Sequence, residues 1–429
     1  MPRLADPRFA PDCVIRLDGR AVPARTGESV TSALLAAGRP LIGRSPKYHR
    51  PRGPFCLSAS CASCLVRVDG VPNVRACEVA CRDGQVVETQ NALGGAAHDL
   101  LGAIDLLSPK GLDHHHLATF NQLANRLAVL ATRRLSGLGH PSNRPPDPWR
   151  AGAEEGFDAV VVGAGPAGLG AAAALAEGGR RALLCDREGK LGGRLRCRLG
   201  LDGDPPLAWA EEVASAVVGS GGEVATRTVA MGLWPCEGGA FAALVESGEN
   251  RIRLVRSQRW VLACGTWAQP PVFPGNDLPG IHAARGLLVA LAEDGVVPGE
   301  QVAVLGRGPE AEAAAACFRR VGARAVSVSG DVARARGGRR LAALDLADGS
   351  RVHCDSLAVA TPRMPAAELA REVGARLALD PETGGFRVDP GSDGRVAPGV
   401  VAVGEVTGPC TAAEAVAAGR GCAGEASLG

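Results

Sequence analysis

Four cysteines near the start of the chain follow one compact spacing. Cys56, Cys61, Cys64 and Cys77 form the pattern C-x4-C-x2-C-x12-C. Three thiolates on one tight loop and a fourth from the next strand can clamp a [2Fe–2S] cluster, whereas zinc sites pair C-x2-C knuckles at a wider separation. We therefore expect these four thiols to be the metal ligands. Cys81 is a weaker alternative for the fourth ligand. The alternative to a metal site is that these cysteines are buried free thiols.

The ligand loop has one unusual property. Loops of this kind generally carry glycine where the backbone approaches the cluster, but the residues between Cys56 and Cys61 are Leu-Ser-Ala-Ser. This composition predicts a cluster loop that is strained or more exposed than usual.

The sequence around the cysteines is typical of a small β-grasp domain. Two runs, 14–17 and 21–24, flank the Asp-Gly of a hairpin, and a helix is expected over 29–37. After the cysteine loop, runs 65–68 and 71–74 flank a second Asp-Gly, and a short strand is expected over 85–89.

A dinucleotide fingerprint begins about a hundred residues after the cysteines. Gly163, Gly165 and Gly168 follow an apolar strand at 158–162 and precede a helix expected over 171–179. The first two glycines allow the turn and the approach of a pyrophosphate, and the third allows helix and strand to pack. Asp186 ends the next strand, 18 residues later, where an acid holds a ribose hydroxyl. Strand, turn, helix and acid together predict a bound dinucleotide, against a plain tight turn.

A second, degraded fingerprint follows the strand at 302–306. Gly306-x-Gly308-x-x-Ala311 replaces the third glycine with alanine, which packing tolerates. The strand that should end in an acid ends at Ser329, and Asp331 comes two residues late. A nicotinamide dinucleotide would lack a ribose partner here or depend on Asp331, so we do not expect strong NAD binding.

These segments define an α/β fold: two dinucleotide-binding domains of Rossmann type, the second nested in the first, preceded by a β-grasp [2Fe–2S] domain. A helical connector is indicated by the apolar spacing of residues 100–107 and 121–135 and by the prolines of 140–148. Residues 226–264 are expected to be a meander of strands. A strand at 400–405 precedes a helix at 411–423. The predicted domains are residues 1–92 (cluster), 93–156 (connector), 157–284 with 356–429 (first dinucleotide-binding domain) and 285–355 (nested unit).

Composition excludes several classes of function. The net charge of +2 argues against nucleic acid and anionic membranes as partners. No stretch approaches the length of a transmembrane helix, and the first residues lack an apolar signal region, so we expect a cytoplasmic protein. Fourteen cysteines in such a chain are then ligands and small buried hydrophobes.

Some chemistries lack the residues that they need. A flavin disulfide reductase uses two neighbouring cysteines, but Cys197 stands alone after the Gly-Gly of 192–193. No Ser–His–Asp or zinc-type pattern is present, and no catalytic residue can be assigned. The run 114–116 (His-His-His) points in different directions on a helix, so we expect it to be linker.

At these motifs the chain resembles the α subunits of heteromeric amine and imino-acid oxidoreductases: sarcosine oxidase, opine oxidase and the cyanide-forming glycine dehydrogenase. Residues 50–77 resemble their ferredoxin-like module, and 161–175 their first nucleotide loop. Residues 260–281 resemble the strand and loop that return over the flavin, and 402–424 their closing flavin motif. The resemblance implies that Gly404 and Glu405 lie near the ribityl and phosphate groups.

The candidate cofactor-binding residues form one set. They are Gly163, Gly165, Pro166, Ala167, Gly168, Asp186, Arg187, Gly193, Arg194, Gly265, Gly404 and Glu405. The resemblance implies FAD as the nucleotide and leaves NAD or ATP as less favoured ligands, with FMN at a subunit interface as a further cofactor.

The resemblance also implies a division of labour. A partner β subunit, itself a flavoprotein of amine-oxidase type, would oxidise the C–N bond of sarcosine, an opine, proline or glycine. This chain would relay electrons through flavin and a [2Fe–2S] cluster to a downstream acceptor. Two alternatives stay open: a stand-alone NAD(P)H-dependent flavin and iron–sulfur reductase, and a nucleotide-binding scaffold without redox activity.

Overall fold

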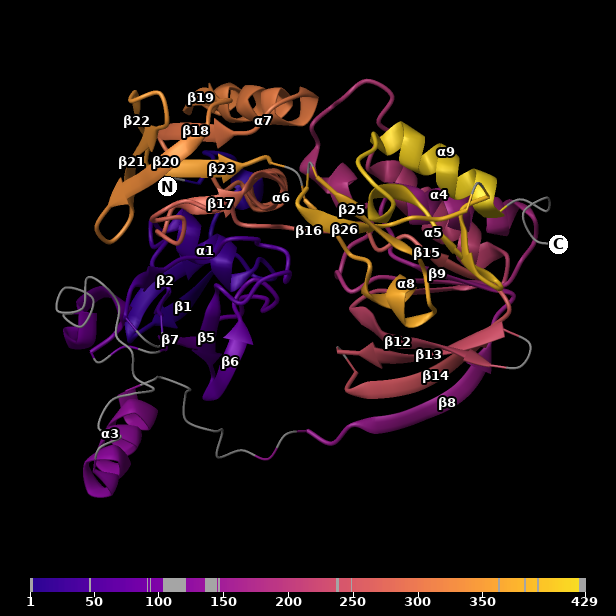
Figure 1. Cartoon of the computed structure of the whole chain (residues 1–429), viewed down its shortest axis with the longest axis horizontal. Coiled ribbons are helices and arrows are strands. Elements are labelled where there is room, and N and C mark those ends of the chain that lie inside the picture. Colours follow the sequence, from indigo (N-terminus) through magenta and orange to yellow (C-terminus); the bar gives the residue numbers. More distant parts are fainter. Residues whose placement is uncertain are drawn as a thin grey trace. The chain divides into compact units, whose positions relative to one another are not determined.

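The structure is a computed structural model (Figure 1). It describes residues 3–45, 48–90, 92, 94–102, 121–135, 145, 147–236, 239–247, 249–361, 363–381, 383–391 and 393–423. The chain divides into two compact units. Unit 1 consists of residues 1–145 and 270–361, and unit 2 of residues 146–269 and 362–429.

The N-terminal part of unit 1 is a five-stranded sheet covered by one helix. Its strand order is β2-β1-β7-β5-β6, with β1 Cys13–Leu17, β2 Arg20–Ala24, β5 Leu65–Val68, β6 Val71–Arg75 and β7 Val86–Thr89. Alternate residues of β1 are buried, which is the pattern of a half-buried strand. Helix α1 (Val30–Ala36) begins where the Ser29 hydroxyl accepts a hydrogen bond from the Ser32 N–H at 3.0 Å.

Several short elements surround this sheet. They are η1 Pro7–Phe9, β3 Gly43–Arg44, β4 Pro51–Arg52, η2 Ala96–His98, η3 Leu100–Gly102 and helix α3 Gln122–Leu135.

The second part of unit 1 is a small dinucleotide fold. Its parallel sheet has the order β17-β23-β18-β19, with β17 Ile281–Ala283, β18 Gln301–Leu305, β19 Arg324–Val328 and β23 Ser356–Val359. The helices are α6 Ala284–Asp294 and α7 Pro309–Arg320, and an antiparallel sheet contains β20 Val332–Gly337, β21 Leu341–Leu346 and β22 Arg351–His353.

Unit 2 is built on a six-stranded sheet with helices packed on it. The order is β11-β10-β9-β15-β28-β27, parallel except for β27. The strands are β9 Ala159–Val162, β10 Ala182–Cys185, β11 Glu223–Ala225, β15 Trp260–Leu262, β27 Arg395–Ala397 and β28 Val400–Ala402, and the helices are α4 Pro166–Glu177, α5 Ala208–Gly219 and α9 Ala412–Ala423. Strands β10, β15 and β28 are buried along their whole length, as a sheet covered on both faces requires.

A second sheet in unit 2 has the order β12-β13-β14-β8. It contains β8 Arg150–Gly156, β12 Thr228–Cys236, β13 Gly239–Glu246 and β14 Arg251–Ser257. Shorter elements are η4 Gly193–Cys197, β16 Thr266–Trp267, β24 Met364–Pro365, α8 Glu368–Glu372, β25 Leu377–Asp380, β26 Gly385–Val388 and η5 Gly404–Val406.

The structure confirms the expected hairpins, the parallel strands of both dinucleotide folds and the C-terminal helix. Three local expectations were wrong. Helix α4 begins at Pro166, inside the expected turn, because proline suits the first helical position. Residues 260–262 join the parallel sheet instead of the meander. The strand expected over 400–405 ends at Ala402, before the η5 turn.

Some expectations fall on residues that are not described. These are 103–107 of the first connector helix, the histidines at 114–116 and most of the boundary at 140–148. The predicted domain limits stay a prediction. Within the described part of the chain, no helix is both long enough and apolar enough to span a membrane.

His282 gives unit 1 a defined dependence on pH. Its ring is fully buried in the middle of β17, and Nδ1 donates to the Pro54 carbonyl at 2.6 Å. Burial lowers the pKa of His282 to about 4 from 6.5. Folding therefore favours the neutral ring. The contribution of the buried neutral ring to the stability of the fold is complete above pH 6.5 and is lost as the pH falls towards 4.

We expect the His282→Asn variant to remove this dependence. The asparagine amide can still donate to Pro54 but does not titrate. The wild-type thermal midpoint should fall more steeply than that of the variant between pH 6.5 and 4, by the equivalent of at most about 3 kcal/mol. Parallel thermal-unfolding curves for the two proteins over this range would contradict the assignment.

Candidate cofactor sites

The turn between β9 and α4 can be made only with glycine at two positions. Gly163 has φ +104°, and a Cβ added there would lie 2.3 Å from the Ala263 carbonyl oxygen. A Cβ on Gly168 would lie 1.7 Å from the Gly163 carbonyl oxygen. Contacts this short cannot form, so both glycines allow main chain to approach main chain. This is the strand–helix packing that the fingerprint predicts.

The middle glycine leaves open space. A Cβ on Gly165 would meet no atom within 4 Å, and Gly193 lies behind it, with its own Cβ position 2.8 Å from the Gly165 Cα. Gly165 caps α4 without a side-chain hydrogen bond, and the first turn of α4 contains no acidic residue. The free N–H groups and the helix dipole therefore suit a pyrophosphate.

Asp186 is tied to this turn by its own hydrogen bonds. Its Oδ2 accepts from the Ala164 N–H at 2.6 Å and its Oδ1 from the Glu188 N–H at 2.8 Å. Burial raises the pKa of Asp186, and it raises the pKa of Glu188 as well. Glu188 lies 3.5 Å from Arg196 and was not among the predicted residues. The end of β10 thus carries two desolvated carboxyls where a ribose would lie.

A polar cluster joins segments that are far apart in the sequence. Arg194 Nη1 lies 3.2 Å from Glu405 Oε1 and donates to the Cys410 carbonyl at 2.7 Å. The Thr266 hydroxyl donates to Glu405 Oε2 at 3.3 Å, and Arg363 Nε donates to Thr266 Oγ1 at 2.8 Å. The structure therefore brings together Arg194 and Glu405, two of the candidate residues, with Thr266 next to Gly265.

Thr266 and Arg363 were missed because neither belongs to a motif with fixed spacing. Gly404 completes the arrangement: its φ is +79°, and an added Cβ would lie 2.7 Å from the Ala167 Cβ. Arg187 stacks on the Trp267 ring at 4.5 Å. All of the predicted nucleotide residues therefore belong to one region of unit 2.

The four motif cysteines converge in unit 1. Cys56 and Cys64 are buried, and Cys61 and Cys77 are partly exposed. The Cys64 and Cys77 sulfurs are 3.5 Å apart. A hydrogen bond with Cys61 lowers the pKa of Cys56, and a second one with Cys77 adds to this effect. A hydrogen bond with Cys77 also lowers the pKa of Cys64. Cys56 thus contacts two of the other thiols.

This donor set fits a binuclear cluster. Among the described residues, no group of three or more His, Cys, Asp or Glu side chains is placed to hold a metal ion. A [2Fe–2S] cluster instead takes four thiolates shared between two irons. Four soft sulfur donors, each interacting with at least one of the others, match that requirement.

The ligand loop is strained, as its lack of glycine predicts. Leu57 and Ala59 both have φ +56°, in the left-handed region that glycine normally occupies. The Ser58 N–H between them donates to the Cys56 sulfur at 3.4 Å. The loop therefore turns around Cys56 at a conformational cost.

Cys81 lies apart from this group. Burial raises the pKa of its thiol to about 12, and its electrostatic neighbours are Glu28, Cys13, Asp294 and Arg3, none of which is a motif cysteine. Its N–H donates to the Glu28 carbonyl at 2.7 Å. None of the fourteen cysteines is paired in a disulfide.

The second fingerprint turn has the right backbone but the wrong charge. Gly306 packs against Ala360, and a Cβ on Gly308 would meet open space. However, Glu310 and Glu312 lie in the first turn of α7. Two carboxylates at a helix N-terminus oppose a pyrophosphate there. Glu310 is already bound to Arg285 through contacts of 2.7 and 2.8 Å.

Two family profiles match the chain. Residues 12–92 match the 2Fe-2S iron-sulfur cluster binding domain, and residues 161–204 match an NAD(P)-binding Rossmann-like domain. These matches and the two sites support a [2Fe–2S] cluster and FAD as cofactors.

Several curated proteins are similar to this chain. The alpha subunit of sarcosine oxidase from Rhizobium meliloti is 33% identical over 309 residues, 67% of this chain and 31% of that protein. An opine oxidase subunit of the same organism is 34% identical over 36% of this chain and 34% of its own length. Hydrogen cyanide synthase subunit HcnA of Pseudomonas aeruginosa is 39% identical over 19% of this chain and 76% of its own length. The chain thus spans about a third of the length of the sarcosine oxidase subunits that it matches.

One solved structure shares the fold over nearly the whole chain. L-proline dehydrogenase from P. horikoshii has a TM-score of 0.76 and 20% identity, and the match covers 98% of this chain and 74% of that one. Taken together, these matches show that the chain belongs to the family of α subunits of heteromeric amine and imino-acid oxidoreductases, with a [2Fe–2S] domain on the same chain as the dinucleotide-binding domain.

Proposed function

We propose that this chain is the electron-transfer α subunit of a heteromeric flavoprotein amine or imino-acid dehydrogenase or oxidase. FAD would be held by the α4 turn, Asp186, Arg194 and Glu405, and the cluster by Cys56, Cys61, Cys64 and Cys77. The observation that carries the proposal is the combination of an open anion-binding turn with a four-thiol donor set on one chain.

Each site supplies part of what a relay needs. When bound, a flavin takes up two electrons and a [2Fe–2S] cluster takes up one at a time. The residues of this chain would bind and orient these groups: the α4 N-terminus would hold the pyrophosphate, and the Ser58 N–H, which donates to the Cys56 sulfur, would stabilise a cluster thiolate. We assign no catalytic base to this chain.

The oxidation of the amine would take place on a partner subunit. The named activities of the relatives, on sarcosine and opines, give the substrate class that we propose, with sarcosine, an opine, proline or glycine oxidised by an amine-oxidase-type flavoprotein. A downstream acceptor would receive the electrons. We also propose that the complex is cytoplasmic, because cysteines remain without disulfides in that compartment and none of the fourteen forms one.

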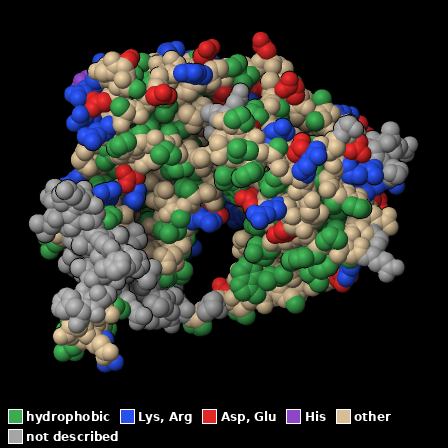
Figure 2. Space-filling view, in the orientation of Figure 1, with side chains coloured by type: hydrophobic (Ala, Val, Ile, Leu, Met, Phe, Trp, Pro, Cys, Tyr) green, Lys and Arg blue, Asp and Glu red, His purple; other side chains and the backbone are tan. Residues whose placement is uncertain are grey.

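An exposed apolar sheet face supports the need for a partner. Met231 and Trp234 of β12 and Ile252 and Leu254 of β14 are each at least 39% exposed, and Trp234 stacks on Phe241 of β13. Figure 2 shows hydrophobic side chains gathered where Figure 1 labels β12 and β13. Contiguous apolar surface of this kind marks protein–protein contacts.

The main alternative is a stand-alone NAD(P)H-dependent reductase. It requires nicotinamide binding at Gly306 and Gly308, where Glu310 and Glu312 oppose the pyrophosphate. Adding NADH to the purified chain should leave the flavin absorbance unchanged, while a partner subunit with its amine should bleach it. Rapid bleaching by NADH alone would favour the reductase. The other alternative, a scaffold without redox activity, requires a purified chain that carries neither a flavin nor a cluster absorbance band.

The cluster ligands can be tested with a matched pair of cysteine variants. We expect Cys61→Ser to abolish the visible and paramagnetic signals of the [2Fe–2S] cluster, because it removes one of four thiolates. Cys81→Ser, four residues beyond Cys77, should retain them. Flavin content should be unchanged in both, since the nucleotide site belongs to unit 2. The opposite pattern, with signals lost only in Cys81→Ser, would refute the ligand assignment.

The nucleotide turn offers an equally direct variant. Gly165 has extended φ and ψ values of −79° and −175°, which any residue adopts, and its Cβ would meet only open space. Gly165→Val should therefore fold normally and weaken FAD binding at least about tenfold, because the side chain fills the space for the pyrophosphate. Gly156→Ala, whose added Cβ would also meet no atom within 4 Å, is the control. Normal flavin occupancy in folded Gly165→Val would rule out this turn as the site.

A further inference from the structure

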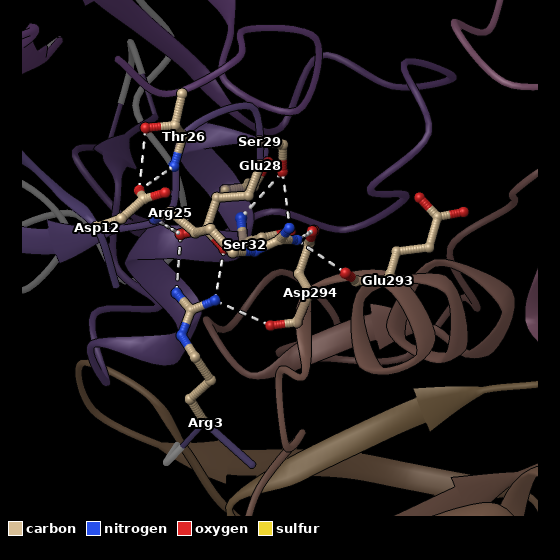
Figure 3. Close-up of polar contacts among 10 residues, drawn as sticks. Arg3, Asp12, Arg25, Thr26, Glu28, Ser29, Ser32, Glu293 and Asp294 are labelled. Atoms are coloured by element: carbon tan, nitrogen blue, oxygen red, sulfur yellow. Dashed lines mark hydrogen bonds and ion pairs between the residues drawn. The ribbon is translucent and has the colours of Figure 1, made fainter. Parts of the chain in front are cut away.

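Helix α6 of the nested dinucleotide fold contacts the cluster domain within unit 1. The last turn of α6 contains no basic residue of its own. Arg3 Nη1 donates to the Asp294 carbonyl at 2.9 Å, and Arg25 Nη2 donates to the Glu293 carbonyl at 2.8 Å and to Asp294 Oδ1 at 2.7 Å (Figure 3). Cations are stabilising at a helix C-terminus, so these two arginines fasten that end of α6 to the cluster domain.

Glu28 holds both arginines in place. Its fully buried carboxylate contacts Arg3 through two hydrogen bonds, of 2.6 and 2.8 Å, and accepts the Arg25 N–H at 2.8 Å (Figure 3). Removing one member of such a group would leave a buried charge uncompensated. These contacts therefore hold the C-terminal end of α6 against the cluster domain.

Apolar packing continues along the helix towards the cysteines. Leu35 of α1, Ala290 of α6 and Val296 form a separate buried cluster. Leu57, the residue after Cys56, packs against this cluster. We call this interface the α6 contact. It consists of residues 282–296 on one side and of Arg3, Arg25, Leu35 and Leu57 on the other, and through Leu57 it reaches the ligand loop.

At the N-terminal end of α6, the contact is made to the main chain of the ligand loop itself. The Ala283 N–H donates to the Phe55 carbonyl at 2.8 Å, and the His282 ring bonds the Pro54 carbonyl. A Cβ added to Gly286 would lie 2.2 Å from the Cys56 carbonyl oxygen and 2.9 Å from the Leu57 Cβ. The helix therefore touches the peptide of Cys56 at a position where no side chain fits.

We infer that Gly286 is a positioning residue for the [2Fe–2S] cluster: its bare backbone lets α6 seat the Cys56–Leu57 peptide and so fixes the first cluster ligand. The inference rests on the proposed role of Cys56 as a ligand. It gives the nested dinucleotide fold a function that does not require a nucleotide.

The physical link to the cluster is a hydrogen bond. The Ser58 N–H donates to the Cys56 sulfur, and the peptide that Gly286 touches lies directly before it. A methyl group at 286 requires that peptide to move by about 1 Å. Weakening a hydrogen bond to a cluster thiolate disfavours the reduced, more negative state, so the potential falls.

The test compares Gly286→Ala with Gly330→Ala in the full chain. Gly330 belongs to the same nested fold, and its Cβ would meet nothing within 4 Å. In redox titrations followed by paramagnetic resonance, Gly286→Ala should show a lower midpoint potential and shifted g values, and Gly330→Ala should match the wild type. A purely structural role would change thermal stability or iron content and leave the potential of the remaining clusters unchanged, which would overturn the inference.

A second variant covers the case in which Gly286→Ala does not fold, as judged by its circular dichroism spectrum. Arg25→Met removes one of the two arginines that hold the far end of α6, without adding a steric clash. Its midpoint potential should shift in the same direction by a smaller amount, and an unchanged potential would contradict the inference. A wild-type chain without any [2Fe–2S] signal would instead refute the proposed function, so the two failures are distinguishable.

Discussion

Close approach of main chain to main chain at glycine positions underlies both cofactor sites. In unit 2, Gly163 and Gly168 close the β9–α4 turn, and Gly170 and Gly419 allow α4 and α9 to touch. In unit 1, Gly286 brings α6 against the Cys56 peptide. Each of these contacts lies below the distance that a Cβ could tolerate, so the geometry of the sites depends on the absence of side chains.

The two dinucleotide folds of the chain differ in charge more than in backbone. The α4 N-terminus has no acidic residue in its first turn, whereas the α7 N-terminus has Glu310 and Glu312. Arg285, next to Gly286, is bound to Glu310. In the nested fold, the elements that would handle a nucleotide are therefore engaged with one another and with the cluster domain.

Motifs with fixed spacing made most of the fold, and the local geometry around the candidate residues, predictable. The hairpins around Asp-Gly, the cysteine pattern and the glycine turn are local signals, and their expected geometry was found at Cys56, Gly163 and Gly165. The contributions of Thr266, Arg363 and Glu188 could not be predicted, because they depend on tertiary contacts. The parallel pairing of β8 with β14 and the α6 contact join residues about a hundred and more than two hundred positions apart.

The central claim is that one chain binds both an FAD and a [2Fe–2S] cluster. Quantifying flavin and iron in the purified full chain tests it most directly. We predict about one FAD and two irons per chain, with the absorbance of both groups. A folded chain that carries flavin but no iron, or iron but no flavin, would contradict the account.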